Sequence, residues 1–167
     1  MLRELRNKKA FGILEVIIAS AIIGASVLAL VTVFLLASAT VEASRKKIQA
    51  IFIIDEGIEV LRFLRDGSWS GTFAALSPGT DYYLSFSTTT SKWSMSTSPS
   101  AAIDGIFNRS FRIENVSRNA SSNIESIYDP VNNDPGTKKV IMRVEWLFRG
   151  ENKSMTLENY FVNLFGN

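Results

Sequence analysis

The sequence predicts an α+β protein in which a long N-terminal helix covers a small antiparallel sheet. Three observations lead to this prediction. Residues 16–41 contain no charged side chain, and residues 51–66 carry apolar and charged positions at helical spacing. Beyond residue 81 the hydrophobic period changes to two. One helix followed by a run of strands is typical of an α+β fold whose helix packs on one sheet face.

The N-terminal apolar run is long enough to cross a membrane. At about 1.5 Å per residue, residues 16–41 form a helix of about 39 Å, which exceeds the roughly 30 Å hydrocarbon core of a bilayer. Basic residues before the run keep the N-terminus in the cytoplasm by the positive-inside rule. These are Arg3, Arg6, Lys8 and Lys9. A secretory cleavage site could be imagined at Ala37-Ser38-Ala39, but the preceding apolar run is far longer than the usual stretch of about 7 to 15 residues.

The second half of the helix is predicted to be amphipathic. Apolar residues recur at spacings of three and four on one side, at Ile51, Ile54, Ile58 and Leu61. Charged residues follow the same spacing on another side, at Asp55, Glu59, Arg62 and Asp66. We expect the apolar side to pack on the protein's own sheet, or alternatively on a partner helix. The helix should end near Gly67, which can supply the C-terminal cap.

Period-two alternation predicts five strands. Three of them are expected at residues 82–87, 92–95 and 107–116, with Phe107, Phe111 and Ile113 on one side of the third. The fourth alternates most clearly, with Val140, Met142, Val144, Trp146 and Phe148 on its apolar side. A turn at residues 149–152 leads into the last strand, marked by Met155, Leu157 and Phe161, so the last two strands should form a hairpin.

Composition excludes several kinds of site. The chain has no cysteine, which excludes disulfides and thiolate metal sites, and no histidine, the commonest general base. Its net charge is only +2, and its downstream basic residues lie among acidic ones, whereas a nucleic-acid surface needs a clustered basic face. No serine has a recognisable activating partner. We therefore expect a protein that is not an enzyme and binds no nucleic acid.

Glu15 is the residue that most needs an explanation. It is the only charged residue between Lys9 and Glu42, and a carboxylate within a bilayer costs a few kcal/mol and is a candidate functional residue by default. Two interpretations are open. Glu15 is either a partly hydrated interfacial residue without a special partner, or a functional residue that pairs with another charge.

The junction at residues 8–15 has a recognisable order of residues. Basic residues are followed by the small residue Ala10, by Phe11, by an apolar run and by Glu15 at the fifth position after Ala10. This order resembles the class III signal of type IV prepilins and type II secretion pseudopilins. The resemblance implies that a prepilin peptidase cuts between Ala10 and Phe11 and that Phe11 is then methylated. Ala10 stands where glycine is usual, and residues 12–14 read Gly-Ile-Leu where Thr-Leu-Ile is commoner.

Two further stretches extend this resemblance over most of the chain. Residues 55–69 (DEGIEVLRFLRDGSW) are similar to the end of the long helix in minor pilins of the V type and in type II secretion protein I. Residues 134–146 (DPGTKKVIMRVEW) are similar to their penultimate strand. Major pilins often have a proline near the position of Thr32, and this chain has none there. The resemblance therefore favours a minor subunit.

The resemblance implies a leader peptide at residues 1–10, a transmembrane and assembly helix at 11–44 and a globular pilin-like domain at 45–167. During assembly, Glu15 of an incoming subunit would pair with the methylated amine of Phe11 in a neighbour. The implied partners are the prepilin peptidase, other pilin or pseudopilin subunits, the inner-membrane assembly platform and the lipid bilayer. The implied location is the cytoplasmic membrane, with the N-terminus in the cytoplasm, and then an extracytoplasmic filament.

A rival hypothesis from a different class is an uncleaved single-pass anchor that displays an extracytoplasmic binding or adhesion domain. A weaker candidate site lies at residues 128–137, which gather Asp129, Asn132, Asn133 and Asp134. Oxygen-rich loops of this kind can hold calcium, but two Asp-Pro pairs and a Pro-Gly are equally natural turn chemistry. No other cofactor is expected.

Overall fold

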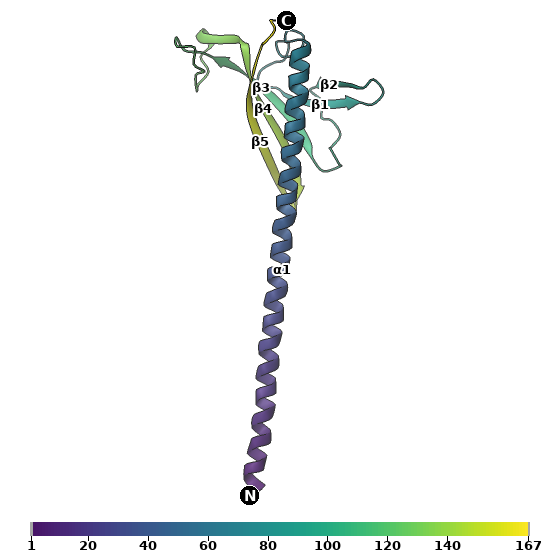
Figure 1. The fold of residues 1–167 in the computed structure, drawn as a ribbon, viewed down its shortest axis with the longest axis vertical. Helices are drawn as coiled ribbons and strands as arrows, with labels where there is room; N and C mark the ends of the chain where they lie inside the picture. The colour runs from purple at the N-terminus through teal and green to yellow at the C-terminus, as the bar shows by residue number, and fades with distance from the viewer. Residues whose placement is uncertain (1, 167) are drawn as a thin grey trace. The chain divides into compact units, whose positions relative to one another are not determined.

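The computed structural model confirms the predicted α+β class (Figure 1). It describes residues 2–166, with side chains described for residues 12–166. One helix, α1 (Leu2–Gly67), precedes five strands. The strands are β1 (Asp81–Ser87), β2 (Lys92–Ser96), β3 (Asn108–Ser117), β4 (Asn133–Phe148) and β5 (Glu151–Val162), and the short 3-10 helix η1 (Pro130–Asn132) precedes β4.

The chain divides into two compact units between Arg45 and Lys46. The described residues of the first unit, 2–45, are all helical. The second unit contains the remainder of α1 and all five strands. All the residues of the hydrophobic core belong to the second unit, between Ala50 and Phe161.

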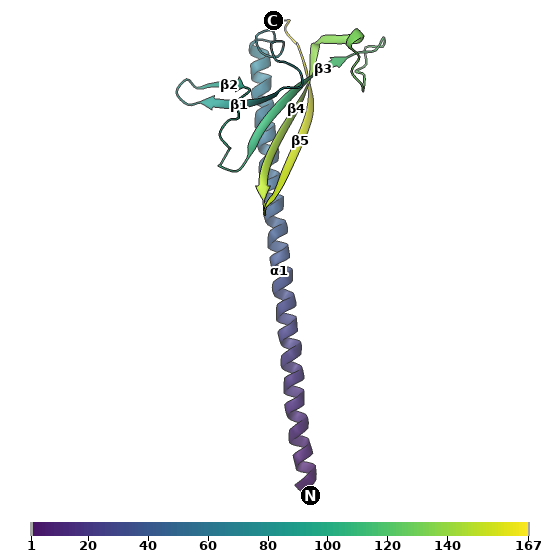
Figure 2. The ribbon, with the colours of Figure 1, turned by 180° about the vertical axis from the view of Figure 1, so that it is seen from behind.

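The sheet has the strand order β2-β1-β3-β4-β5, and every neighbouring pair is antiparallel. Figure 2 shows β5 as the outermost strand on its side. Arg149 and Gly150 connect β4 to β5 with φ angles of 52° and 79°. Positive φ at both central residues is what a two-residue type I′ turn requires. The predicted hairpin is therefore confirmed.

The helix face that covers the sheet is centred on Gly57. A Cβ atom at Gly57 would lie only 2.8 Å from Cε of Met142, so the helix backbone approaches the sheet most closely there. Ile54, Ile58 and Leu61 are buried as predicted. The prediction was wrong for Ile51, which is 43% exposed. At about 100° per residue, Ile51 is turned about 120° from Gly57, away from the sheet.

Buried side chains of the core come from both sides of this interface. On the helix, Ala50, Ile53 and Val60 are buried in addition to the predicted residues. On the sheet, Val140, Met142, Val144 and Trp146 are buried with Phe107, Phe111, Ile113 and Phe161, as the alternation predicts. Leu157, which was predicted on the same side, is 40% exposed. It belongs to the edge strand β5, whose outer side no other strand covers.

One strand boundary and one helix cap differ from the sequence prediction. Strand β4 begins at Asn133, so residues 133–137 are not part of a loop. Asn115 pairs with Lys138 and Val116 pairs with Asp134, so the chain bulges around Pro135 before regular pairing begins. A bulge accommodates proline because its missing N–H is not needed there. The helix ends at Gly67 as predicted, but Gly67 does not have a positive φ. Instead the Thr72 hydroxyl donates to the Leu64 carbonyl at 3.2 Å.

Candidate functional site

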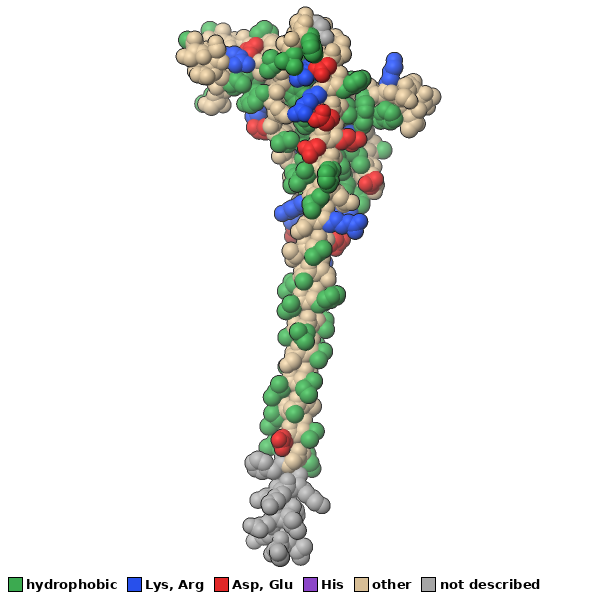
Figure 3. Space-filling model, in the orientation of Figure 1, with side chains coloured by type: hydrophobic (Ala, Val, Ile, Leu, Met, Phe, Trp, Pro, Cys, Tyr) green, Lys and Arg blue, Asp and Glu red, His purple; other side chains and the backbone are tan. Residues whose placement is uncertain are grey.

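The first unit presents an apolar helix surface along residues 12–41 (Figure 3). Its large apolar side chains are exposed on every side, from 50% at Val31 to 70% at Phe34. This helix is long and apolar enough to cross a membrane. Apolar surface gains about 25 cal/mol per Å² when it leaves water. The surface is therefore suited to lipid or to an apolar partner.

Four of the five side-chain hydroxyl groups of residues 12–41 are bonded within the helix, and Ser38 is the exception. Ser20 donates to the carbonyl of Ile17 at 2.9 Å. Ser26, Thr32 and Thr40 donate in the same way to the carbonyls four residues earlier, at 2.8, 2.9 and 3.0 Å. A hydroxyl that is bonded to its own helix costs little to remove from water, whereas an unbonded one costs several kcal/mol in an apolar medium. These four residues therefore leave the apolar character of the surface intact.

Glu15 is the exception on this surface. Its carboxylate has no hydrogen-bond or ion-pair partner among residues 12–166, and no other charged residue lies between residues 12 and 41. It lines a groove of about 420 Å³ along the helix with Leu14, Ile18, Ala19 and Ile22. The side chains of the predicted cleavage residues, Ala10 and Phe11, lie outside the described residues. Glu15 is thus a lone acceptor of positive charge in an apolar groove.

A second apolar surface lies on the part of α1 that belongs to the second unit. Phe52 and Phe63 are 67% and 70% exposed, and Ile48 and Ile51 are exposed beside Phe52. These four residues are called the outer stripe below. Asp55 lies within the same side of the helix and has no partner among residues 12–166. Four large apolar side chains on one exposed helix side are typical of an interaction surface.

The four calcium candidates make hydrogen bonds within the chain. Asp129 accepts from the Val131 amide at 2.9 Å and caps η1. Asn133 accepts from the Tyr128 hydroxyl at 3.1 Å. Asn132 donates to Asp129 at 3.4 Å. Among residues 12–166, no group of three or more His, Cys, Asp or Glu side chains is placed to hold a metal ion.

Asp134 is the centre of a small polar cluster that holds the start of β4. It accepts from Nε of Arg118 at 2.6 Å, from the Thr137 hydroxyl at 2.7 Å and from the Gly136 amide at 2.9 Å. Burial opposes ionisation of Asp134, but the hydrogen bonds from Thr137, Arg118 and Gly136 outweigh it and hold its pKa below the ordinary value of 3.8. Asp134 is therefore a structural carboxylate that is already saturated by protein donors.

Sequence analysis missed a buried arginine at the helix–sheet interface. Arg109 is 4% exposed, and its Nη1 donates to Glu56 Oε2 at 2.8 Å and to the Ile53 carbonyl at 3.1 Å. The guanidinium also lies 5.6 Å from the ring centre of Trp93 on β2. The sequence contained a signal for this burial. Alternate residues of a strand point to the same face, and Arg109 lies two residues from both Phe107 and Phe111, which face inward. Arg109 connects the helix to strands β2 and β3.

Comparison with protein-family models, with curated proteins and with solved structures finds no match to this chain.

Proposed function

We propose that this chain is a membrane-inserted prepilin that is cut between Ala10 and Phe11 and becomes a minor structural subunit of a type IV pilus or a type II secretion pseudopilus. The observation that carries the proposal is Glu15, an unpaired carboxylate on an apolar helix surface. The order of residues at 8–15 resembles the class III prepilin signal, and this resemblance implies a charge partner for Glu15. Cleavage creates a positive amine at Phe11 of each mature chain.

The proposed mechanism is transfer of the helix from lipid to a filament core. Both environments are apolar, so the exposed side chains of residues 12–41 fit either one. In the filament, Glu15 of an incoming subunit meets the methylated amine of Phe11 in a neighbour, and the two charges neutralise one another. The prepilin peptidase and the inner-membrane assembly platform act before this step. The globular unit then lies outside the cytoplasmic membrane.

The outer stripe supports the same proposal. A chain that was only anchored would need apolar surface in the membrane-spanning segment and nowhere else on its helix. Here Ile48, Phe52 and Phe63 are exposed apolar side chains in the unit that carries the sheet, beyond the charged residues at 42 and 45–47. Packing against helices of neighbouring subunits removes these side chains from water, which is favourable by about 25 cal/mol per Å².

A second candidate function is an uncleaved single-pass anchor that displays an extracytoplasmic binding domain. The membrane-spanning character of the helix fits this function equally well. The two candidates differ in what they require of Glu15. An anchor has no need of this carboxylate, whereas an assembling subunit needs its charge.

The test is the incorporation of Glu15→Ala and Glu15→Gln into filaments. Loss of one member of a buried ion pair costs about 3 to 5 kcal/mol, because the other charge stays buried and unpaired. Glu15→Gln keeps the shape of the side chain but not its charge, so it should fail as Glu15→Ala does. The measurement is the fraction of mature subunit in sheared filaments relative to membranes. Mass spectrometry of the same samples should show a methylated N-terminus at Phe11 in every variant.

Glu42→Gln is the matched control, because Glu42 is an exposed carboxylate on the same helix beyond the apolar run. It should assemble as the wild type does. Equal incorporation of all four proteins would refute the assembly role of Glu15. An uncleaved N-terminus in otherwise functional protein would favour the anchor.

A further inference from the structure

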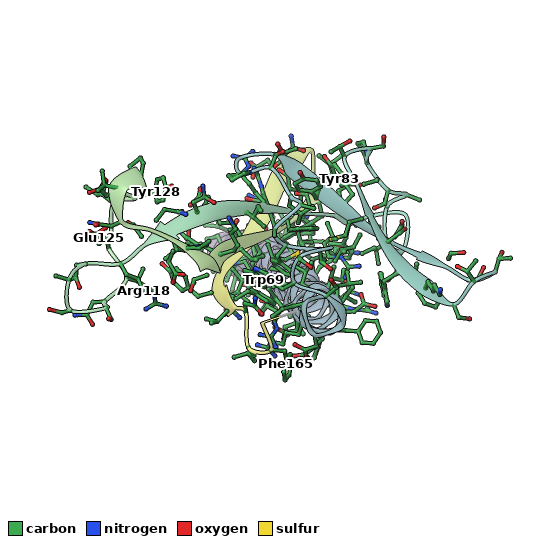
Figure 4. The ribbon with its side chains drawn as sticks, turned by 90° about the horizontal axis from the view of Figure 1, so that it is seen from above. Trp69, Tyr83, Arg118, Glu125, Tyr128 and Phe165 are labelled. Atoms are coloured by element: carbon green, nitrogen blue, oxygen red, sulfur yellow. The ribbon has the colours of Figure 1, made fainter. Side chains whose placement is uncertain are left out.

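The sheet face opposite the helix carries a polar groove. Side chains of a strand alternate between the two faces. The buried residues of β4 face the helix, so Arg143 and Glu145 face away from it. Tyr83 follows the buried Tyr82 on β1 and also faces away (Figure 4). This face belongs entirely to the second unit and has no part in the helix surfaces described above.

The groove consists of two adjoining cavities of about 260 and 270 Å³. Tyr83, Ser110 and Glu145 line both cavities, so the two are continuous. Together they fall within the range of roughly 300 to 1,000 Å³ that is usual for small-molecule sites.

The register of the strands explains why this face is hollow. Ser110 of β3 lies opposite Arg143 of β4, and Arg143 lies opposite Thr156 of β5. Glu145 lies opposite Ser154. Small hydroxyl side chains thus stand beside long ones. The long side chains of Arg143 and Glu145 form the rim of the groove. The small side chains of Ser110, Ser154 and Thr156 form its floor and supply hydroxyl groups there.

The exposed charges on the rim occur in balanced pairs, and the further charged residue that lines the groove, Arg109, is buried and bonds Glu56 on the helix. Arg112 bonds Asp81 at 2.9 Å, and Arg143 bonds Glu145 at 2.6 Å. The four side chains are all 45% to 52% exposed. A guanidinium has five N–H donors, and a carboxylate has about four lone-pair sites. Each pair therefore keeps donors and acceptors free, side by side, while the formal charge of the four groups is zero.

We propose that this groove binds a short, uncharged oligosaccharide. A sugar hydroxyl both donates and accepts, so it can bond an arginine and a carboxylate of the same pair. Because the formal charge of the four groups is zero, neither an anion nor a cation gains a net attraction to the rim. The ring of Tyr83 offers an apolar platform for the C–H face of a sugar ring. This inference goes beyond the proposed function and does not depend on it.

The test is saturation-transfer NMR on the full chain in a detergent whose headgroup is not a sugar. The probes are cellotetraose and a neutral tetrasaccharide of galactose and N-acetylglucosamine. We expect transfer from the protein to the ring protons of at least one probe. Ser110→Leu fills the floor and Tyr83→Ala removes the platform, and each should weaken binding about tenfold or more, equivalent to about 1.4 kcal/mol. Tyr128→Ala is the control, because Tyr128 is an exposed tyrosine outside this groove.

Near-UV circular dichroism establishes that each variant is folded. Binding of a neutral sugar should not change between about 0.1 M and about 1 M salt, because screening acts on charges. Three results would overturn the proposal. These are no transfer to either probe, binding that Ser110→Leu leaves unchanged, and binding that weakens as the salt concentration rises.

Discussion

At the scale of single residues, the charged side chains of this protein fall into two groups with different physical roles. Arg109 and Asp134 are surrounded by protein donors and acceptors and hold elements in place. Glu15 and Asp55 lie on exposed helix surfaces and have no partner among residues 12–166. Breaking the first group should cost stability, whereas changing the second group should affect interactions with other molecules.

Asp134 gives the first prediction, which concerns pH. Its pKa is below the ordinary value of 3.8 in the folded chain, so its contribution to stability is complete above 3.8 and is lost as the pH falls through the folded pKa. At neutral pH, Asp134→Asn should reduce the free energy of unfolding by about 1 to 2 kcal/mol through the loss of charge-assisted hydrogen bonds. Below pH 3.8 this difference should shrink.

The measurement is thermal unfolding of the full chain in detergent, followed by near-UV circular dichroism at several pH values. Asp55→Asn is the control, because Asp55 is exposed on the helix surface, and this change should alter the free energy of unfolding by no more than about 0.5 kcal/mol. A constant difference between wild type and Asp134→Asn over the whole acid range would contradict the prediction.

At the scale of elements, the contact between α1 and the sheet depends on the absence of a side chain at Gly57. Glycine within a helix is less favourable than alanine by about 1 kcal/mol. Its place here is explained by Met142 and Arg109, whose side-chain atoms lie 2.8 Å and 3.0 Å from the position of a Cβ atom. The arginine bonds the helix at Ile53 and Glu56, both in the turn that precedes Gly57.

The second prediction concerns the stability of the variant Gly57→Ala. The gain in helix propensity should be outweighed by overpacking of the fully buried Met142, with a net loss of about 1 to 2 kcal/mol. Gly67→Ala is the matched control on the same helix, because nothing lies within 4 Å of a Cβ atom there. It should be neutral or stabilising. If the two variants unfold at the same temperature, Met142 and Arg109 yield without cost and the contact is looser than the structure indicates.

At the scale of the whole molecule, the hydrophobic core and the helix surface that is apolar enough to span a membrane belong to different units. The hydrophobic core lies entirely within the second unit, from Ala50 to Phe161. The first unit has no buried large apolar side chain among residues 12–45. The second unit should therefore fold without the first.

The third prediction is that a fragment of residues 46–167 folds cooperatively in water, without detergent. A fragment of residues 58–167 is the control, because it lacks Ala50, Ile53 and Ile54 from the core. Loss of each buried isoleucine costs about 2 to 5 kcal/mol, so the shorter fragment should not fold. Near-UV circular dichroism and urea unfolding measure both. A longer fragment without a cooperative transition would show that the first unit contributes to the fold.

The sequence by itself determined the fold class, the end of the helix near Gly67, the hairpin of β4 and β5, and most of the core. It could do so because the hydrophobic period and the turn residues depend only on residues that lie close together along the chain. It also singled out Glu15, because a lone charge in a long apolar run is visible without any structure. The sequence pattern also placed Ile51 and Leu157 in the core. Both residues are exposed, so the local pattern was insufficient for them.

Tertiary structure decided what depends on contacts between distant segments. The rotation of α1 is set by the close approach at Gly57, which depends on Met142 and Arg109 and turns Ile51 outward. The exposure of Leu157 follows from the position of β5 at the edge of the sheet. The groove beside Tyr83 exists because strand register sets Ser110 next to Arg143. Register and packing join residues that are far apart in the chain, and no local period carries that information.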